Sequence, residues 1–144
     1  MVTKEDVMLI HDVAIKVRKK LDSIEKDEEF YQELNSLTKK ERLTILTITD
    51  KGNKTMGEIA DKLGVTISTP TYTVTRLIEK GYVCRQRGEE DRRLVLVSLT
   101  EKGKKFFENV IDLKTRKLEL IFENLSDIEF DMFRKLMQKL DRTL

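Results

Sequence analysis

The stretch that decides the fold is TMGEIADKLGVTISTPTYTVTRLIEKGYVCRQRGEEDRRLVLVSLTEKG, residues 55–103. It predicts two helices joined by a tight turn, followed by a charged β-ribbon. The first helix is expected to begin at Thr55, because Thr55 and Glu58 have the spacing of a capping box. Gly64 then predicts the end of that helix, since glycine adopts the left-handed conformation that commonly follows a helix.

The second helix is expected to have an apolar face and a hydroxyl-rich face. Val74, Leu77 and Ile78 recur at helical spacing and predict the buried side. The other side carries Ser68, Thr69, Thr71, Tyr72, Thr73, Thr75 and Arg76. Hydroxyls can bond phosphates or base edges, and Arg76 can reach a guanine edge or a phosphate, so this face suits the major groove of DNA. The alternative for Arg76 is a surface ion pair with Glu79.

Two short strands, residues 83–87 and 94–99, are expected to enclose the polar tip of the ribbon. Basic side chains gather in this region at Arg76, Lys80, Arg85, Arg87, Arg92 and Arg93. The formal net charge of the chain is only +2, so any nucleic-acid footprint must come from such local clustering. The alternative interpretation is a solvated face of a charge-rich protein.

In its order of turn, helix, ribbon and following helix, the chain resembles the MarR family of bacterial transcriptional regulators. The residues that carry the resemblance are LGV at 63–65, IEKGYV at 78–83, and Asp91-Arg92-Arg93 followed by LVLVSLTEKG. The resemblance implies a winged helix-turn-helix in which Arg93 enters the minor groove and Asp91 fixes its geometry by hydrogen bonding. A narrow minor groove attracts guanidinium groups, which agrees with that role, and Arg92 is expected at a phosphate.

The predicted DNA-binding residues are therefore Ser68, Thr69, Thr71, Tyr72, Thr75, Arg76, Arg87, Asp91, Arg92 and Arg93. Pro70 affects where the second helix begins, because proline fits only the first turn of a helix. We call this helix the reading helix and its hydroxyl-rich side the reading face. Thr66 would be the cap in the register usual for the family. Either the helix starts late, near Ser68 or Thr69, or its first turn is distorted.

Apolar stripes at the two ends of the chain predict a homodimer. They occur along the first helix, from Val7 to Ile24, and along two C-terminal helices separated by a capping box at Ser126 and Glu129. Three such helices are too few to close a bundle, whereas two copies suffice; the alternative is that the stripes pack on the winged domain of the same subunit. The expected division is 1–30 and 104–144 for dimerisation helices and 31–103 for the winged domain, with another helix from Thr38, capped with Glu41, as its scaffold.

Other functions have little support in the composition. Cys84 is the single cysteine and His11 the single histidine, which predicts no disulfide, no metal site, no cofactor and no enzymatic activity. The N-terminus lacks the apolar core of a signal peptide and no run approaches the length of a membrane span, so a cytoplasmic protein without membrane contact is expected.

We therefore expect a mainly α protein with a small β-wing (α+β) that binds double-stranded DNA as a dimeric regulator, most often a repressor in the family, on a pseudo-palindromic operator. The resemblance also implies a small-molecule or acyl-type ligand, because residues 65–83 resemble regulators of fatty-acid synthesis genes that use acylated carrier protein as corepressor. Two alternatives stay open. One is thiol-based redox sensing through Cys84, and the other is a winged helix used for protein interaction.

Overall fold

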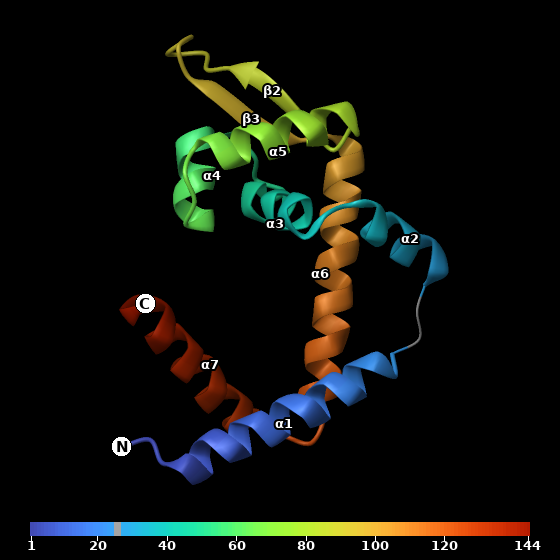
Figure 1. The fold of residues 1–144 in the computed structure, drawn as a ribbon, viewed down its shortest axis with the longest axis vertical. Coiled ribbons are helices and arrows are strands. Elements are labelled where there is room, and N and C mark those ends of the chain that lie inside the picture. The colour runs from blue at the N-terminus through green and yellow to red at the C-terminus, as the bar shows by residue number, and fades with distance from the viewer. Residues whose placement is uncertain (25–26) are drawn as a thin grey trace. The chain divides into compact units, whose positions relative to one another are not determined.

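The computed structural model describes residues 1–24 and 27–144, which form a helical chain with a small sheet (Figure 1). The helices are α1 (Lys4–Asp22), α2 (Glu28–Ser36), α3 (Lys39–Ile48), α4 (Met56–Leu63), α5 (Ser68–Glu79), α6 (Glu101–Phe122) and α7 (Asp127–Thr143). The strands β1 (Lys54–Thr55), β2 (Val83–Arg87) and β3 (Val95–Leu99) pair antiparallel in the order β1-β3-β2. The predicted mainly α class with a small β-wing is confirmed.

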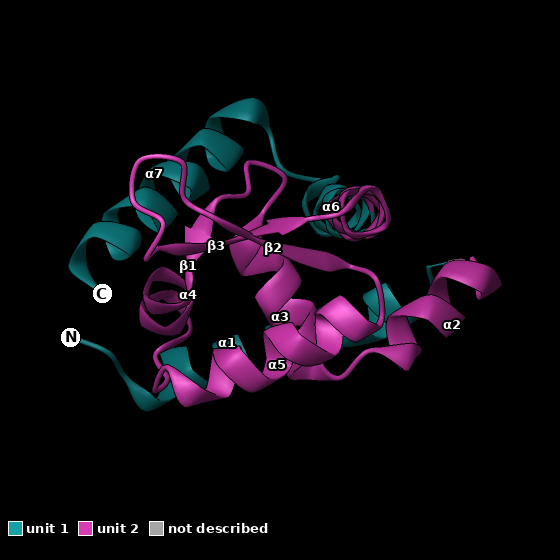
Figure 2. Cartoon of the chain, turned by 90° about the horizontal axis from the view of Figure 1, so that it is seen from above, with its two compact units in different colours: residues 1–25, 113–144 teal, residues 26–112 magenta. Residues whose placement is uncertain are grey.

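The chain forms two compact units, coloured separately in Figure 2. One comprises residues 1–25 and 113–144, and the other comprises residues 26–112. The second unit includes the first half of α6, where Phe106 and Val110 are buried. The units therefore differ in their limits from the predicted functional domains, 1–30, 31–103 and 104–144, which stay predictions about function.

Capping boxes begin helices in both units. The pairs are Thr3 with Asp6 on α1, Thr38 with Glu41 on α3, Thr55 with Glu58 on α4, and Ser126 with Glu129 on α7. The backbone amide of the cap residue donates to the carboxylate, which holds the pKa of Glu58 and of Glu129 below the usual range. The three boxes predicted from the sequence are confirmed, and the box on α1 adds one that was not predicted.

The unit of residues 26–112 is called the winged unit below. Its core lies where α3 meets α4 and α5. Ile45 and Ile48 on α3, Ile59 on α4 and Leu77 on α5 are fully buried. Such isoleucine and leucine side chains each contribute about 1.5–3 kcal/mol through burial. The helix that follows Thr38, α3, thus packs behind α4 and α5 and is the scaffold that the sequence predicts.

The turn before α4 contributes a strand that the sequence did not predict. Gly52 and Asn53 take positive φ angles in this turn. The chain then pairs as β1 with β3, placing Lys54 opposite Val97. Asn53 Oδ1 accepts hydrogen bonds from Gln86 Nε2 at 3.1 Å and from Ser98 Oγ at 3.2 Å. This polar cluster joins the turn to the wing strands.

Helix α2 was also missed, although its sequence carried a signal. Asp27 caps it by accepting from the amide of Phe30, and the Phe30 ring packs 6.0 Å from that of Phe106. Arg42 then donates from one guanidinium nitrogen to the carbonyls of Leu34 and Leu37, each at 2.8 Å. These bonds fix the corner between α2 and α3.

Tyr82 joins α2 to the start of the wing. Its ring lies edge-on to Phe106 at 5.6 Å, and its hydroxyl donates to Glu33 Oε1 at 2.9 Å. Burial of the phenol, with a further contribution from the Glu33 hydrogen bond, raises the pKa of Tyr82 to about 12. The folded protein therefore favours the neutral phenol.

This raised pKa predicts a loss of stability at alkaline pH. Because the folded pKa lies above the unfolded value of about 10, the stabilisation is fully present below pH 10 and disappears as pH rises toward about 12. Tyr82→Phe should therefore lose less unfolding free energy than the parent between neutral pH and about pH 11. Urea unfolding at the two pH values measures the difference. Equal losses in the two proteins would show that Tyr82 is not responsible.

Candidate nucleic-acid interface

Helices α4 and α5 meet across a tight turn in which Gly64 takes the left-handed conformation, with φ of 63°. The amide of Val65 bonds to the carbonyl of Ala60 at 3.1 Å, closing the end of α4. Helix α5 begins at Ser68 without a side-chain cap, so Pro70 falls in its first turn, where no amide donor is needed. The late start, one of the two alternatives left open by the sequence, is confirmed.

The two predicted faces of α5 are present, with one correction. Val74 and Leu77 are fully buried, and Ile78 is half-buried. Thr73, expected on the reading face, is only 5% exposed. It shares the inward side with Pro70, Val74 and Leu77, since positions three and four apart lie together on a helix. Its hydroxyl donates to the carbonyl of Thr69, which removes it from the reading face.

The exposed face of α5 carries most of the predicted DNA-binding residues of that helix. Ser68, Thr71, Tyr72, Thr75 and Arg76 are exposed, and Thr69 is half-buried. Thr71 Oγ1 donates to the carbonyl of Ile67 at 2.7 Å, and Thr75 Oγ1 donates to the carbonyl of Thr71 at 2.9 Å. A hydroxyl that has used its hydrogen keeps only its acceptor lone pairs. In this arrangement Thr71 and Thr75 are acceptors, suited to the amino group of a base.

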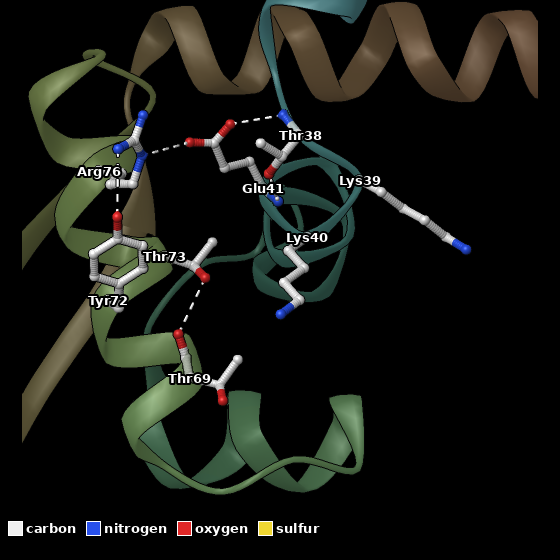
Figure 3. Close-up of a pocket in the computed structure, with 8 residues that line it drawn as sticks. All are labelled: Thr38, Lys39, Lys40, Glu41, Thr69, Tyr72, Thr73 and Arg76. Atoms are coloured by element: carbon white, nitrogen blue, oxygen red, sulfur yellow. Dashed lines mark hydrogen bonds and ion pairs between the residues drawn. The ribbon is translucent and has the colours of Figure 1, made fainter.

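The Arg76 side chain extends from α5 toward Glu41 in the first turn of α3 (Figure 3). Its Nε donates to Glu41 Oε1 at 3.4 Å, and a terminal nitrogen donates to the Tyr72 hydroxyl at 3.4 Å. The hydrogen bonds to Tyr72 and then to Glu41 raise the pKa of Arg76 further above its ordinary value, so it stays charged. The alternative ion-pair partner, Glu79, is wrong: Glu41 takes that place.

A groove of about 710 Å³ opens beside this contact. Its lining residues come from the N-terminal turn of α3 and from α5: Thr38, Lys39, Lys40, Glu41, Thr69, Tyr72, Thr73 and Arg76 (Figure 3). Lysine and arginine side chains therefore meet at the reading surface from two helices. The lysines of α3 were not predicted as part of this surface.

Strands β2 and β3 and the segment between them form the wing. The amide of Gly88 bonds to the carbonyl of Leu94 at 2.9 Å, which closes the tip, and β3 begins at Val95 rather than Leu94. Arg87 and Arg92 are exposed. Asp91 Oδ1 accepts from the Arg93 amide at 3.0 Å and lies 3.5 Å from Arg93 Nε. This is the hydrogen bonding that the family resemblance implied.

Arg85 links the wing to the reading helix and was not among the predicted contacts. One of its terminal nitrogens donates to Thr75 Oγ1 at 3.1 Å and to the carbonyl of Thr71 at 3.5 Å. Arg85 is exposed and adds positive charge beside α5. The sequence shows that Arg85 belongs to the basic cluster. Its contact with α5 could not be predicted, because that contact depends on how β2 crosses the helix.

Cys84 is an exposed free thiol whose Sγ donates weakly to the carbonyl of Ser98 at 3.7 Å. Across residues 1–24 and 27–144, no group of three or more His, Cys, Asp or Glu side chains could hold a metal ion. The same described part of the chain contains no helix long and apolar enough to cross a membrane.

Helix α4, the turn, helix α5 and the wing of β2 and β3 together form a winged helix-turn-helix, a class of DNA-binding fold. The sequence profile of the MarR family matches residues 37–95. The transcriptional regulator YpoP of Bacillus subtilis is 33% identical over 115 residues, which cover 76% of this chain and 82% of YpoP. The chain belongs to the MarR family of DNA-binding transcriptional regulators and is not an enzyme.

Two further Bacillus subtilis relatives match shorter segments. The regulator YfiV is 34% identical over 69% of this chain and 62% of its own length. The transcriptional repressor YetL is 35% identical over 56% of this chain and 48% of its own length. The chain thus spans less than two thirds of either relative.

The fold is similar to that of a regulator solved with DNA. The structure of Streptococcus pneumoniae FabT in complex with DNA superposes with a TM-score of 0.66 and 26% identity, covering 95% of this chain and 90% of FabT.

Proposed function

We propose that the protein is a cytoplasmic homodimer that represses transcription by binding a pseudo-palindromic site on double-stranded DNA, and that a small-molecule or acyl-type ligand tunes this binding. The relative YetL is named as a repressor, and FabT is a structural neighbour solved with DNA. The single observation that carries the dimer is the exposure of the apolar helices at the two ends of the chain.

Helices α1 and α7 have no buried residue among those described. The exposed fractions are 67% for Ile10 on α1, and 74% for Ile128 and 55% for Leu136 on α7. Soluble monomers rarely expose contiguous apolar patches of this kind, whereas interfaces between protein chains do. A second copy of the chain would cover these helices.

In such a dimer the two α5 helices would enter successive major grooves about 34 Å apart, one helical turn of DNA. The residues proposed to contact DNA are Ser68, Thr69, Thr71, Tyr72, Thr75 and Arg76 on α5, and Arg87, Asp91, Arg92 and Arg93 on the wing. Exposure of these side chains, except for half-buried Thr69, supports the assignment.

An apolar groove of about 480 Å³ supports the proposal of a ligand. It lies within the unit formed by both chain ends and is lined by Thr115, Leu118, Glu119, Phe122, Leu125, Asp127 and Phe130. Phe122 packs against Phe130 and Phe133, with ring centroids 5.4 and 4.8 Å apart. Such aromatic and aliphatic walls suit an acyl chain or an aromatic compound.

Leu136→Glu tests the dimer, and with it the proposed function. The substitution places one carboxylate per subunit in the proposed seam, where burial without a partner costs several kcal/mol. We expect at least about a 100-fold weaker dimer, together with loss of high-affinity binding in a mobility-shift assay with fragmented genomic DNA. Sedimentation velocity measures the oligomeric state.

Gln138→Glu is the matched control, because Gln138 is exposed and lies on the other side of α7. It adds the same charge and should leave the dimer intact. A parent protein that sediments as a monomer, or a Leu136→Glu variant that dimerises like the control, would contradict the proposal. A dimer that binds no DNA fragment would instead favour the protein-interaction alternative.

A further inference from the structure

We propose that Glu41 is a positioning residue for DNA recognition, which fixes the Arg76 side chain on the exposed face of α5; this inference rests on the proposed DNA-reading role of that helix. Glu41 belongs to the first turn of α3, yet it is only 1% exposed. It is one of the most deeply buried charged side chains in the described part of the chain. Its partners explain how a carboxylate is tolerated there.

The Glu41 carboxylate accepts three hydrogen bonds, one from the cap of its own helix and two from α5 and its C-terminal end. The Thr38 amide donates to Oε2 at 2.7 Å, Lys80 Nζ donates to Oε2 at 2.9 Å, and Arg76 Nε donates to Oε1 at 3.4 Å. Burial by itself would raise the pKa of Glu41, but the hydrogen bonds from Lys80, Thr38 and Arg76 outweigh it and hold the pKa below its usual range. The group is therefore an anion at neutral pH.

The capping box accounts for only part of this arrangement. A capping glutamate needs the amide of its cap residue, and on α4 Glu58 meets that need by accepting from the Thr55 amide while remaining exposed. Glu41 adds two cations, both from α5 or its C-terminal end. The anion thus attaches α5 to α3 at two points one helical turn apart.

For Arg76 the consequence is a fixed orientation. Its side chain is 46% exposed and would otherwise sample many rotamers. Glu41 holds Nε, and the Tyr72 hydroxyl holds a terminal nitrogen (Figure 3). Guanidinium has five N–H groups, so donors remain for a base edge or phosphate. A side chain ordered before binding loses less entropy when it contacts DNA.

Lys80 secures the same anion from the C-terminal end of α5. Its ammonium also donates to the Ser36 carbonyl at 3.1 Å, at the end of α2. Because Lys80 neutralises Glu41 independently of Arg76, loss of Arg76 leaves the buried carboxylate paired. The exposed Arg76 can therefore be varied without leaving a bare charge in the interior.

The experiment compares base preferences of variants on a randomised double-stranded DNA library. Glu41→Gln keeps the size of the side chain but removes its charge, and Arg76→Ala removes the group that it positions. We expect each change to reduce the preference at one symmetric base pair by about tenfold. Glu41→Gln should have no further effect on that preference in the Arg76→Ala background, because both changes act through one side chain.

Two other variants separate positioning from folding. Glu58→Gln alters the equivalent capping residue of α4 and should keep the parent's preference, even if both glutamine variants lower the thermal midpoint. Arg76→Lys retains the charge at an exposed position that does not endanger folding, but cannot span Glu41 and Tyr72. It should lose the preference as Arg76→Ala does.

The inference is overturned if Glu41→Gln lowers stability but preserves the parent's base preference, if it reduces the preference equally without Arg76, or if Arg76→Lys behaves as the parent. A parent protein that selects no sequence at all would overturn the proposed sequence-specific function as well. The two failures are thus distinguishable by the behaviour of the parent.

Discussion

Gly103→Ala is expected to destabilise the winged unit more than any other single methyl addition at a glycine of this chain. Gly103 lies in the first turn of α6, where its amide donates to Thr100 Oγ1 at 3.2 Å. A β-carbon there would overlap the carbonyl oxygen of Tyr82 and approach its carbonyl carbon to 3.0 Å. That carbonyl accepts from the Thr100 amide at 3.0 Å, so it cannot move without breaking the junction between wing and helix.

Two effects of the methyl group oppose each other. Alanine improves helix propensity over glycine by about 1 kcal/mol. Overpacking against backbone costs about 1–3 kcal/mol or more, and here the neighbour is a hydrogen-bonded carbonyl rather than a flexible side chain. We expect the clash to prevail, with a net loss of about 2 kcal/mol or more. Urea unfolding gives the value.

Gly57→Ala is the control, because Gly57 also lies in the first turn of a helix. A β-carbon there would meet only Thr55 Oγ1, at 3.8 Å, an ordinary contact. This variant should equal or exceed the stability of the parent, since only the propensity effect operates. If Gly103→Ala proves as stable as Gly57→Ala, the close approach of Tyr82 is not a constraint on the sequence.

Local signals account for what the sequence predicted well. The boxes at Thr38, Thr55 and Ser126 each involve residues three positions apart, and Gly64 acts through its own backbone conformation. The late start of α5 follows from the restricted geometry of Pro70. In each case the determining interaction lies within one helical turn, where a linear pattern contains the necessary information.

Interactions between distant segments were beyond the same reasoning. Glu79 was the natural local partner for Arg76, but the carboxylate that it contacts belongs to Glu41, 35 residues away. The choice depends on how α3 crosses α5, which no spacing within α5 reveals. Strand β1 is only two residues long and exists because β3 is beside it. Both features follow from packing, not from local propensity.

The reading surface was predicted in part. Most of the predicted side chains on α5 and on the wing are exposed, because helical and strand periodicity assigns faces reliably once the apolar side is known. The prediction that Thr73 lies on the reading face was wrong, because its hydroxyl was given more weight than its helical spacing from the buried residues. Arg85 and the lysines of α3 were missed because their nearness to α5 is tertiary.

Arg93→Ala is expected to produce the largest loss of DNA affinity among single wing substitutions. The Arg93 side chain is 95% exposed, and its ion pair with Asp91, at 3.5 Å, is a surface contact worth little to stability. The folded protein should therefore keep its thermal midpoint. If the guanidinium enters the minor groove, each lost charge-assisted contact costs about tenfold, or about a hundredfold for the two in a symmetric dimer.

Salt dependence and groove chemistry separate this role from a phosphate contact. The slope of log affinity against log salt should decrease by about one unit per subunit, while base preference at the centre of the site stays unchanged. Arg92→Ala is the control, since it removes the same charge from the neighbouring exposed position. Arg92→Ala should reduce the slope by a similar amount. Its loss of affinity should be the same whatever the sequence of the flanks.

The flanks provide the deciding measurement. Guanine adds an amino group to the minor groove, whereas inosine presents the same major-groove edge without it. Parent protein should therefore bind a site with inosine in its flanks nearly as well as one with adenine, and should bind the guanine version more weakly. Arg93→Ala should bind all three flanks equally, because the side chain that senses the groove is absent. A variant that still discriminates against guanine would place another group in the minor groove, and unchanged overall affinity would exclude the wing tip from DNA recognition.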